Sequence, residues 1–243
     1  MRLTRVYVEA PLVSGGRCVI AGSAAHHMVR VLRLDADSAV TLFDGTGGEY
    51  AARVESIRKD AVLVEVGARA ATERESPLAV TLAQGVSRGE RMDWVIQKAT
   101  ELGVRRIVPL ITERSVVRLD ARQAQKKSQH WRGIAIAACE QCGRNRLPEL
   151  AAPEDLLRYL ASEASKETLR LLLSPAGTLR IGALDPQKKS TLLIGPEGGL
   201  TTAERAAAIT QGFVEVQLGP RILRTETAAI AALAALQCSW GDL

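Results

Sequence analysis

Three short, almost uninterrupted apolar runs constrain the fold of this 243-residue chain more than any other feature of its sequence. They cover residues 169–173, 191–194 and 213–218. Runs of this length fit strands that are buried on both faces, as in a parallel sheet covered by helices. The same rhythm extends back to Pro77, with strands expected at 78–83 and 106–111 and helices at 88–102 and 123–141. The pattern predicts an α/β domain with a parallel sheet.

The N-terminal part of the chain follows a different rhythm. Strand-like segments fall at residues 5–8, 17–20, 39–43, 50–57 and 61–66. Ser23 is the expected N-cap of a short helix that runs through Leu32. Several short strands at close spacing predict a small β-barrel. Residues 67–77 lose the alternation and gain charge, so we expect a barrel domain at 1–72 and an α/β domain at 73–243.

The positive charge of the chain is concentrated in its middle third. The whole chain carries a net charge of +5, whereas residues 81–146 hold 13 Lys and Arg against 6 Asp and Glu, a net +7. A localised basic zone suits a phosphate-rich partner, because neutralised phosphates release counterions. An ordinary solvated surface explains the same charge equally well.

Neither a membrane segment nor a metal site is indicated. No stretch approaches the roughly 20 apolar residues of a membrane helix, and the first residues lack a secretory-signal pattern, so we expect a cytoplasmic protein. Cys139 and Cys142 form a C-x-x-C pair, but a structural zinc site needs about four ligands and no second pair exists. The pair falls late in an expected helix, which also disfavours redox chemistry.

A first glycine-rich loop, GPEGGL, follows the expected strand at 191–194 and covers residues 195–200. Thr201 and Glu204 have capping-box spacing, so a helix should begin directly after the loop. Ligands of open α/β sheets bind at the carboxyl ends of strands, where this loop would lie. Its spacing excludes a Walker A site and a dinucleotide fingerprint. From the pattern alone, a ligand loop and a tight turn without a ligand are about equally plausible.

A second loop repeats this arrangement, because Gly219-Pro220 follows the run at 213–218 and precedes an expected helix at 225–237. Thr225 is the expected N-cap of that helix. Two such turns could form two walls of one pocket, although two turns without a ligand remain possible.

Together the loops resemble the paired cofactor loops of SPOUT RNA methyltransferases. The sequences that carry the resemblance are GPEGGL at 195–200 and LGPRILRTETA at 218–228. They are most similar to the bacterial 16S ribosomal RNA (uracil-N3)-methyltransferase family, whose target is U1498. Residues 30–33, 88–92, 96–98, 101–103 and 137–144 match the same family, so the resemblance covers essentially the whole chain.

The resemblance implies a fold, a cofactor and partners. The α/β domain would be a SPOUT domain with a deep trefoil knot, and the N-terminal barrel would be a PUA-like RNA-binding domain. The family uses S-adenosyl-L-methionine, acts as a homodimer and modifies 16S ribosomal RNA, with no metal or membrane involved. The implied cofactor-binding residues are Leu193, Gly195, Glu197, Gly198, Leu218, Gly219, Ile222, Leu223 and Thr227.

Candidate catalytic and RNA-binding residues follow from the chemistry of uridine methylation. Arg224 or Arg144 could stabilise a uridine anion, and Glu140 or Glu197 could accept the N3 proton. Candidate RNA contacts are Arg30, Arg33, Arg88, Arg91, Lys98, Arg144 and Arg146. Trp94 and Trp131 could both stack on bases, although Trp94 sits beside the apolar face of its helix and is rather expected in the core. A methyltransferase for another RNA site and a non-catalytic RNA-binding protein are the alternative functions.

Overall fold

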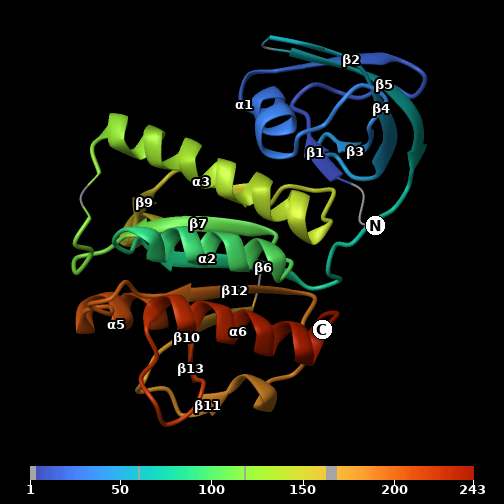
Figure 1. The fold of residues 1–243 in the computed structure, drawn as a ribbon. Helices are drawn as coiled ribbons and strands as arrows, with labels where there is room; N and C mark the ends of the chain where they lie inside the picture. The colour runs from blue at the N-terminus through green and yellow to red at the C-terminus, as the bar shows by residue number, and fades with distance from the viewer. Residues whose placement is uncertain (1–3, 60, 118, 163–168) are drawn as a thin grey trace. The chain divides into compact units, whose positions relative to one another are not determined.

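The computed structural model describes residues 4–59, 61–117, 119–162 and 169–243 (Figure 1). Contacts divide the chain into two units. The first runs from the N-terminus to Glu75 and includes Ile136–Leu147, and the second contains Ser76–Ala135 and Pro148–Leu243. Nothing in the sequence pattern indicated that residues 136–147 belong with the first unit. The expected boundary between residues 72 and 73 stays a prediction.

The first unit is built on a curled five-stranded sheet, as the PUA-like prediction requires. Its strands are β1 Thr4–Tyr7, β2 Arg17–Ala21, β3 Ala39–Phe43, β4 Glu49–Arg58 and β5 Ala61–Ala70, in the order β1-β3-β4-β5-β2. In β5, the alternating residues Val62, Val64 and Val66 are buried in the core of the unit. This alternation matches the period of two that a half-buried strand shows.

One helical segment of the first unit departs from prediction. Helix α1 (Gly22–His26) continues directly into a π-helical turn, His27–Val31. The N-cap is Ala21 and makes no side-chain capping bond, so the assignment of Ser23 as N-cap was wrong. Gly22 adopts φ = +66° and turns the chain into the helix directly after β2, so the helix starts two residues earlier than predicted.

The second unit contains an eight-stranded sheet whose paired strands all run parallel. Its strands are β6 Ala79–Gly85, β7 Arg106–Ile111, β8 Glu149–Leu150, β9 Glu154–Asp155, β10 Leu169–Leu173, β11 Leu179–Arg180, β12 Lys189–Ile194 and β13 Val214–Gln217. The order is β11-β13-β10-β12-β6-β7-β8, and β9 pairs with β7. The predicted α/β fold with a parallel sheet is therefore confirmed, whereas the trefoil knot stays a prediction.

Helices cover both faces of this sheet (Figure 1). Neighbouring residues such as Leu82 and Ala83 enter different cores, as do Leu192 and Leu193. One core includes residues of α2 (Glu90–Glu101), α3 (Ala121–Cys142) and α6 (Thr225–Trp240), and the other includes residues of α4 (Leu156–Ala161) and α5 (Thr202–Thr210). Burial on both faces explains why these strands are almost continuously apolar.

Across the described ranges, no helix combines the length and the apolarity that a membrane crossing needs.

Candidate functional site

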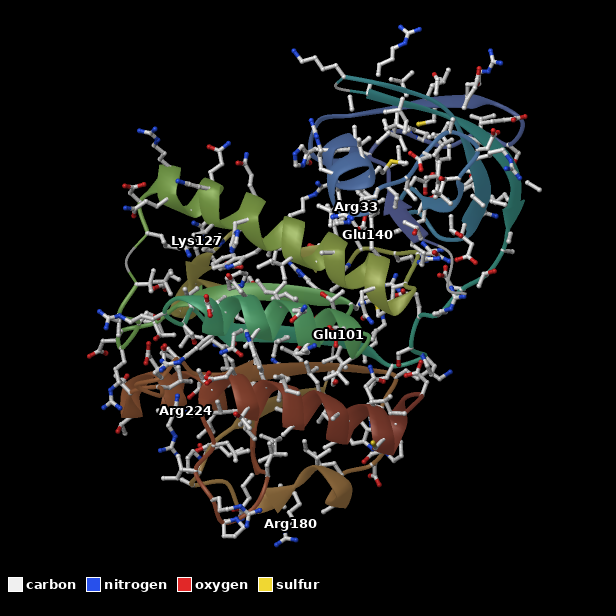
Figure 2. The ribbon with its side chains drawn as sticks, in the orientation of Figure 1. Arg33, Glu101, Lys127, Glu140, Arg180 and Arg224 are labelled. Atoms are coloured by element: carbon white, nitrogen blue, oxygen red, sulfur yellow. The ribbon has the colours of Figure 1, made fainter. Side chains whose placement is uncertain are left out.

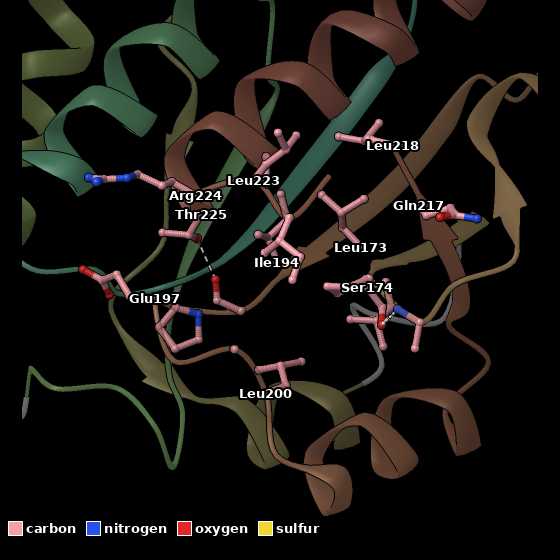
Figure 3. A pocket seen from close by; sticks show the side chains of 18 of the residues that line it. Leu173, Ser174, Ile194, Glu197, Leu200, Gln217, Leu218, Leu223, Arg224 and Thr225 are labelled. Atoms are coloured by element: carbon pink, nitrogen blue, oxygen red, sulfur yellow. Dashed lines mark hydrogen bonds between the residues drawn. The ribbon is translucent and has the colours of Figure 1, made fainter. Parts of the chain in front are cut away.

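A cavity of about 650 Å³ lies in the second unit, where β10, β12 and β13 end (Figure 3). Three chain segments supply its walls: the end of β10, the first glycine-rich loop after β12, and the second loop after β13 with the start of α6. The two loops thus enclose one space, as their repeated pattern suggested. The carboxyl ends of parallel strands are where α/β proteins bind ligands.

The two loops are joined directly by a hydrogen bond. Thr225 Oγ1 donates to the carbonyl oxygen of Gly195 over 2.7 Å (Figure 3). Thr225 Oγ1 also accepts a 2.9 Å bond from Nε2 of Gln84, a side chain with no solvent exposure at the end of β6. Three separate segments therefore meet at one hydroxyl group.

Thr225 was expected to cap α6, but its hydroxyl is used elsewhere. The N-cap is Arg224, which makes no side-chain capping bond, and Thr225 is the first helical residue. The N-cap assignment was wrong because the Thr225 hydroxyl bonds to Gly195 instead of to the backbone of its own helix.

Pro196 packs against a glycine of the neighbouring strand. A Cβ atom added to Gly85 would overlap the backbone nitrogen and the Cδ atom of Pro196. Only glycine therefore allows the first loop to lie this close to β6.

Glu197 fixes the middle of the first loop. Its Oε1 accepts hydrogen bonds from the backbone N–H of Arg88, at 2.9 Å, and from Nη1 of Arg91, at 2.7 Å. Burial raises the pKa of Glu197, but the N–H of Arg88, the residue's own N–H and the Arg91 guanidinium together bring that pKa below its ordinary value of 4.5. The side chain is thus a carboxylate at neutral pH and is already bonded to Arg91 in α2 and to Arg88, just before that helix.

The outer side of the first loop is held by the turn after β7. Arg114 Nη1 donates to the carbonyl oxygen of Gly198 over 3.1 Å, and the backbone N–H of Glu113 donates to Glu204 over 2.8 Å. Glu204 also completes the predicted capping box with Thr201, which is confirmed. Because bonds reach the loop from several elements, its backbone is fixed before any ligand arrives.

The third wall was not anticipated from the sequence. Residues 172–176 line the cavity, and Ser174 donates its N–H to Val216 while its Oγ accepts from Ala176. A Cβ at Gly177 would approach the backbone of Val216 to 2.7 Å. The signal was available, because a buried strand followed by Ser-Pro-Ala-Gly repeats the arrangement of the two loops that were identified.

Not all predicted cofactor residues reach the cavity. Those that line it are Gly195, Glu197, Leu218, Gly219, Ile222 and Leu223. Leu193 instead lies fully buried in the core beneath the sheet, and Thr227 is exposed on α6. Gly198 is not among the lining residues, although its neighbour Gly199 is.

Two kinds of arginine border the cavity. Arg91 and Arg205 are neutralised by Glu197 and Glu215, at 2.7 Å in each case. Arg221 and Arg224 are exposed and form no ion pair with any residue that the structure describes. Figure 3 shows Arg224 and Glu197 at one end of the cavity, away from Ser174 and Gln217. Arg224 is therefore available to an incoming anionic group.

Glu140 and Arg144 belong to the first unit. The buried guanidinium of Arg144 forms two bonds to Glu75, at 2.9 and 2.6 Å. Glu140 accepts a 3.0 Å bond from the backbone N–H of Tyr7; burial raises its pKa, and this outweighs the opposing effects of the Tyr7 N–H and of charges on His27 and Arg5. Both side chains are thus engaged in holding the end of α3 within the first unit (Glu140 is labelled in Figure 2).

The Cys139–Cys142 pair lies at the end of α3, within the first unit. Both cysteines are free, and burial raises the pKa of Cys139 to about 12. The described residues contain no group of three or more His, Cys, Asp or Glu side chains that could hold a metal ion.

The predicted RNA contacts fall into two groups, those already held in ion pairs and those exposed to solvent. Arg91, Lys98, Arg144 and Arg146 each pair with a carboxylate of their own unit, whereas Arg30, Arg33 and Arg88 are exposed.

The exposures of Trp94 and Trp131 are the reverse of what was expected. Trp131 is 1% exposed in the core, so it cannot stack on a base, and Trp94 is 57% exposed. Trp94 lies on the face of α2 opposite its buried residues, such as Met92 and Ile96.

Comparisons with known proteins agree along the whole chain. Residues 74–237 match the family described as an RNA methyltransferase domain, and residues 20–67 match an RNA methyltransferase PUA domain. The ribosomal RNA small subunit methyltransferase E of Buchnera aphidicola is 36% identical, with 100% of this chain and 98% of that protein covered. The protein of the same name from Bacillus subtilis is 35% identical, with 97% and 94% covered.

Two solved structures are similar over their full length. A methyltransferase from Legionella pneumophila, in complex with the bound cofactor SAM, has a TM-score of 0.96 and 41% identity. A ribosomal RNA small subunit methyltransferase E from Neisseria gonorrhoeae, bound to S-adenosyl methionine, has a TM-score of 0.92 and 37% identity. Each comparison covers 100% of both chains.

Proposed function

Because this chain belongs to the ribosomal RNA small subunit methyltransferase E family, we propose that it transfers a methyl group from S-adenosyl-L-methionine to N3 of a uridine in 16S ribosomal RNA. The proposal depends above all on the hydrogen bond from Thr225 to Gly195, which joins the two loops around one cavity. We propose that the enzyme methylates U1498, in the small ribosomal subunit.

The cavity suits the cofactor in size and in lining. Its volume of about 650 Å³ falls within the roughly 300–1,000 Å³ of small-molecule sites. Gly199 and Gly219 line it with positive φ angles, and a Cβ on either would meet no atom within 4 Å. The backbone of both loops is therefore open to close approach by a ligand. Leu173, Ile194 and Leu223 supply apolar surface for an adenine ring.

The bound cofactor supplies an activated methyl group on a sulfonium, which is a good leaving group. The residues of the chain then have to align the uridine with that methyl group and keep water out. The loops suit this task because their backbone is fixed by bonds from several neighbouring elements.

Arg224 is our candidate for stabilising the uridine anion. It lines the cavity and, within the described ranges, has no carboxylate partner. A guanidinium beside the base would lower the free energy of the N3 anion as its proton leaves. Glu197 is a weaker candidate for the proton acceptor, because its Oε1 is already bound by Arg88 and Arg91. Glu197 would instead hold the loop that contacts the cofactor.

The partners in this proposal follow from the family resemblance. The first unit would bind RNA as a PUA-like domain, the enzyme would act as a homodimer with knotted protomers, and its substrate would place it in the cytoplasm. Light scattering of the purified protein tests the dimer.

The direct test is mass mapping of modified nucleosides in 16S ribosomal RNA from cells with and without the gene. We expect a single 3-methyluridine to disappear on deletion and to return with the wild-type gene. An unchanged modification pattern, together with no binding of S-adenosyl-L-methionine in calorimetry, would contradict the proposal.

A further inference from the structure

Helix α3 contains a group of cations that pair with no described carboxylate, and none of the predicted RNA contacts lies on that helix. Within the basic stretch of residues 81–146, the charges of Arg91, Lys98, Arg144 and Arg146 are cancelled by nearby carboxylates. Arg106 likewise pairs with Glu149. Among the described residues, six cations of this stretch have no carboxylate partner, and three of them lie on the first half of α3; the six are Arg88, Arg105, Arg114, Arg122, Lys126 and Lys127.

The first half of α3 contains cations and no carboxylates. From Ala121 to Cys139 the helix has four Lys and Arg residues and no Asp or Glu. Arg122, Lys126 and Lys127 form no hydrogen bond or ion pair through their side chains with any residue that the structure describes. Repulsion between like charges at this spacing disfavours the free helix, so the arrangement is not explained by stability.

The packing of α3 presents this charge outward. Trp131 and Ala135 anchor the helix in the core of the second unit. Arg122, Lys126 and Gln129 are exposed at positions i, i+4 and i+7, which places them in one stripe along the helix. Lys127, labelled in Figure 2, is half-exposed and lies roughly 100° around the helix axis from Lys126, between that stripe and the core-facing side. The stripe therefore runs along the helix for about two turns, and Gln129 follows its two cations.

We propose that Arg122, Lys126 and Lys127 of α3 form a docking surface for the phosphate backbone of the RNA substrate, distinct from the cofactor cavity. This inference rests on the proposed function, because it adds a second contact to the same substrate. Cations spaced along a helix suit successive phosphates, and the glutamines between them can donate to phosphate or ribose oxygens. The surface positions RNA without reading its sequence.

The test is the salt dependence of RNA binding. The triple variant R122Q/K126Q/K127Q keeps good helix formers at each position, so α3 should persist. A matched control, R158Q/R180Q/K188Q, removes the same charge from exposed positions elsewhere in the second unit (Arg180 is labelled in Figure 2, on the edge strand β11). Binding to a 16S ribosomal RNA fragment is measured over a range of salt concentrations, and calorimetry with S-adenosyl-L-methionine checks the cavity.

We expect the triple variant to lower the slope of log Kd against log salt by about 2 to 3, since each phosphate contact contributes roughly 0.7–0.9. Its KM for RNA should rise by at least about tenfold at moderate salt, with kcat and cofactor affinity unchanged. The control should keep the wild-type slope. Equal slopes for wild type and triple variant, or equal losses in the triple variant and the control, would overturn the proposal.

Separate measurements of binding and methyl transfer distinguish this proposal from the function on which it rests. A wild-type protein that binds RNA through α3 but transfers no methyl group would contradict only the proposed function. An active enzyme whose RNA affinity does not depend on α3 would contradict only the docking surface.

Discussion

Thr225 Oγ1 lies 2.7 Å from the carbonyl oxygen of Gly195 and joins two loops that are 30 residues apart in the sequence. The same hydroxyl accepts a bond from Gln84, whose Oε1 is buried without a partner among the described residues. The hydroxyl thus connects β6, the end of β12 and the start of α6. Because both loops line the cavity, this contact helps to set its shape.

Replacing Thr225 with Val should destabilise the chain and weaken cofactor binding. The substitution keeps the volume but leaves the Gly195 carbonyl and the Gln84 amide short of a partner, which costs about 1–3 kcal/mol. At this chain length each kcal/mol lowers Tm by roughly 2–4 °C. Thermal unfolding and calorimetry with S-adenosyl-L-methionine measure the two effects. Thr225→Ser, which keeps the hydroxyl, is the control, and a Val variant that binds the cofactor as tightly as Ser does would contradict the role of the bond.

Gly85→Ala should displace the first loop. The added Cβ would overlap Pro196, and neither backbone can yield without moving the loop. We expect cofactor affinity to fall by at least about tenfold, with a loss of stability of roughly 1–3 kcal/mol, measured by calorimetry and thermal unfolding.

Gly182→Ala is the matched control for Gly85, because a Cβ there would meet no atom within 4 Å and φ is not positive. This variant should behave as wild type. If Gly85→Ala also retained full cofactor affinity, close packing of Pro196 on β6 would not shape the cavity.

Removing the charge of Glu197 should lower thermal stability and cofactor affinity by amounts that depend on pH. The pKa of Glu197 lies below 4.5 in the folded chain, so its contribution to stability is present above that pH and is lost as the pH falls through the folded value. Glu197→Gln should therefore lower Tm and cofactor affinity at neutral pH, and its difference from wild type should shrink below about 4.5. Thermal unfolding across this range measures the difference.

A Glu→Gln change at the exposed Glu149 is the control for Glu197→Gln, because it removes the same charge away from the cavity. Glu149 pairs with Arg106 on the surface of the same unit, where such pairs contribute little. Glu149→Gln should leave Tm nearly constant. A Glu197→Gln difference that stayed the same, or grew, below pH 4.5 would show that the carboxylate is not what holds the loop.

The elements of the second unit could be predicted because burial on two faces leaves a strong signal in the sequence. The runs at 169–173 and 191–194 are β10 and part of β12, and the capping box at Thr201 begins α5 as expected. The short strands β8, β9 and β11 were missed, because two residues are too few to show any period.

Side-chain partners were much harder to predict than elements. Thr225 has the sequence position of an N-cap, yet its hydroxyl donates a hydrogen bond to the carbonyl oxygen of Gly195, 30 residues away. Arg144 resembled an RNA contact, but Glu75 neutralises it through a pairing across 69 residues. Residue type and local spacing cannot reveal such contacts, since they depend on which distant segments the fold brings together. The same limit hid the basic stripe on α3 until its neighbours' ion pairs were known.

Arg224→Ala should reduce turnover far more than cofactor binding. Arg224 lies exposed on the cavity and, in the described part of the chain, has no carboxylate to neutralise it, so its charge is free to stabilise the uridine anion. Loss of one such stabilising group costs about 10²–10³ in kcat, whereas Kd for S-adenosyl-L-methionine should change only a few-fold. Single-turnover methylation of a 16S ribosomal RNA fragment and calorimetry measure the two quantities.

Arg221→Ala is the matched control, because it removes an equal charge from the same loop and should affect kcat much less. Equal losses in kcat for the two variants would mean that the loop acts through its general positive charge, and equal losses in kcat and cofactor affinity would assign Arg224 to cofactor binding instead.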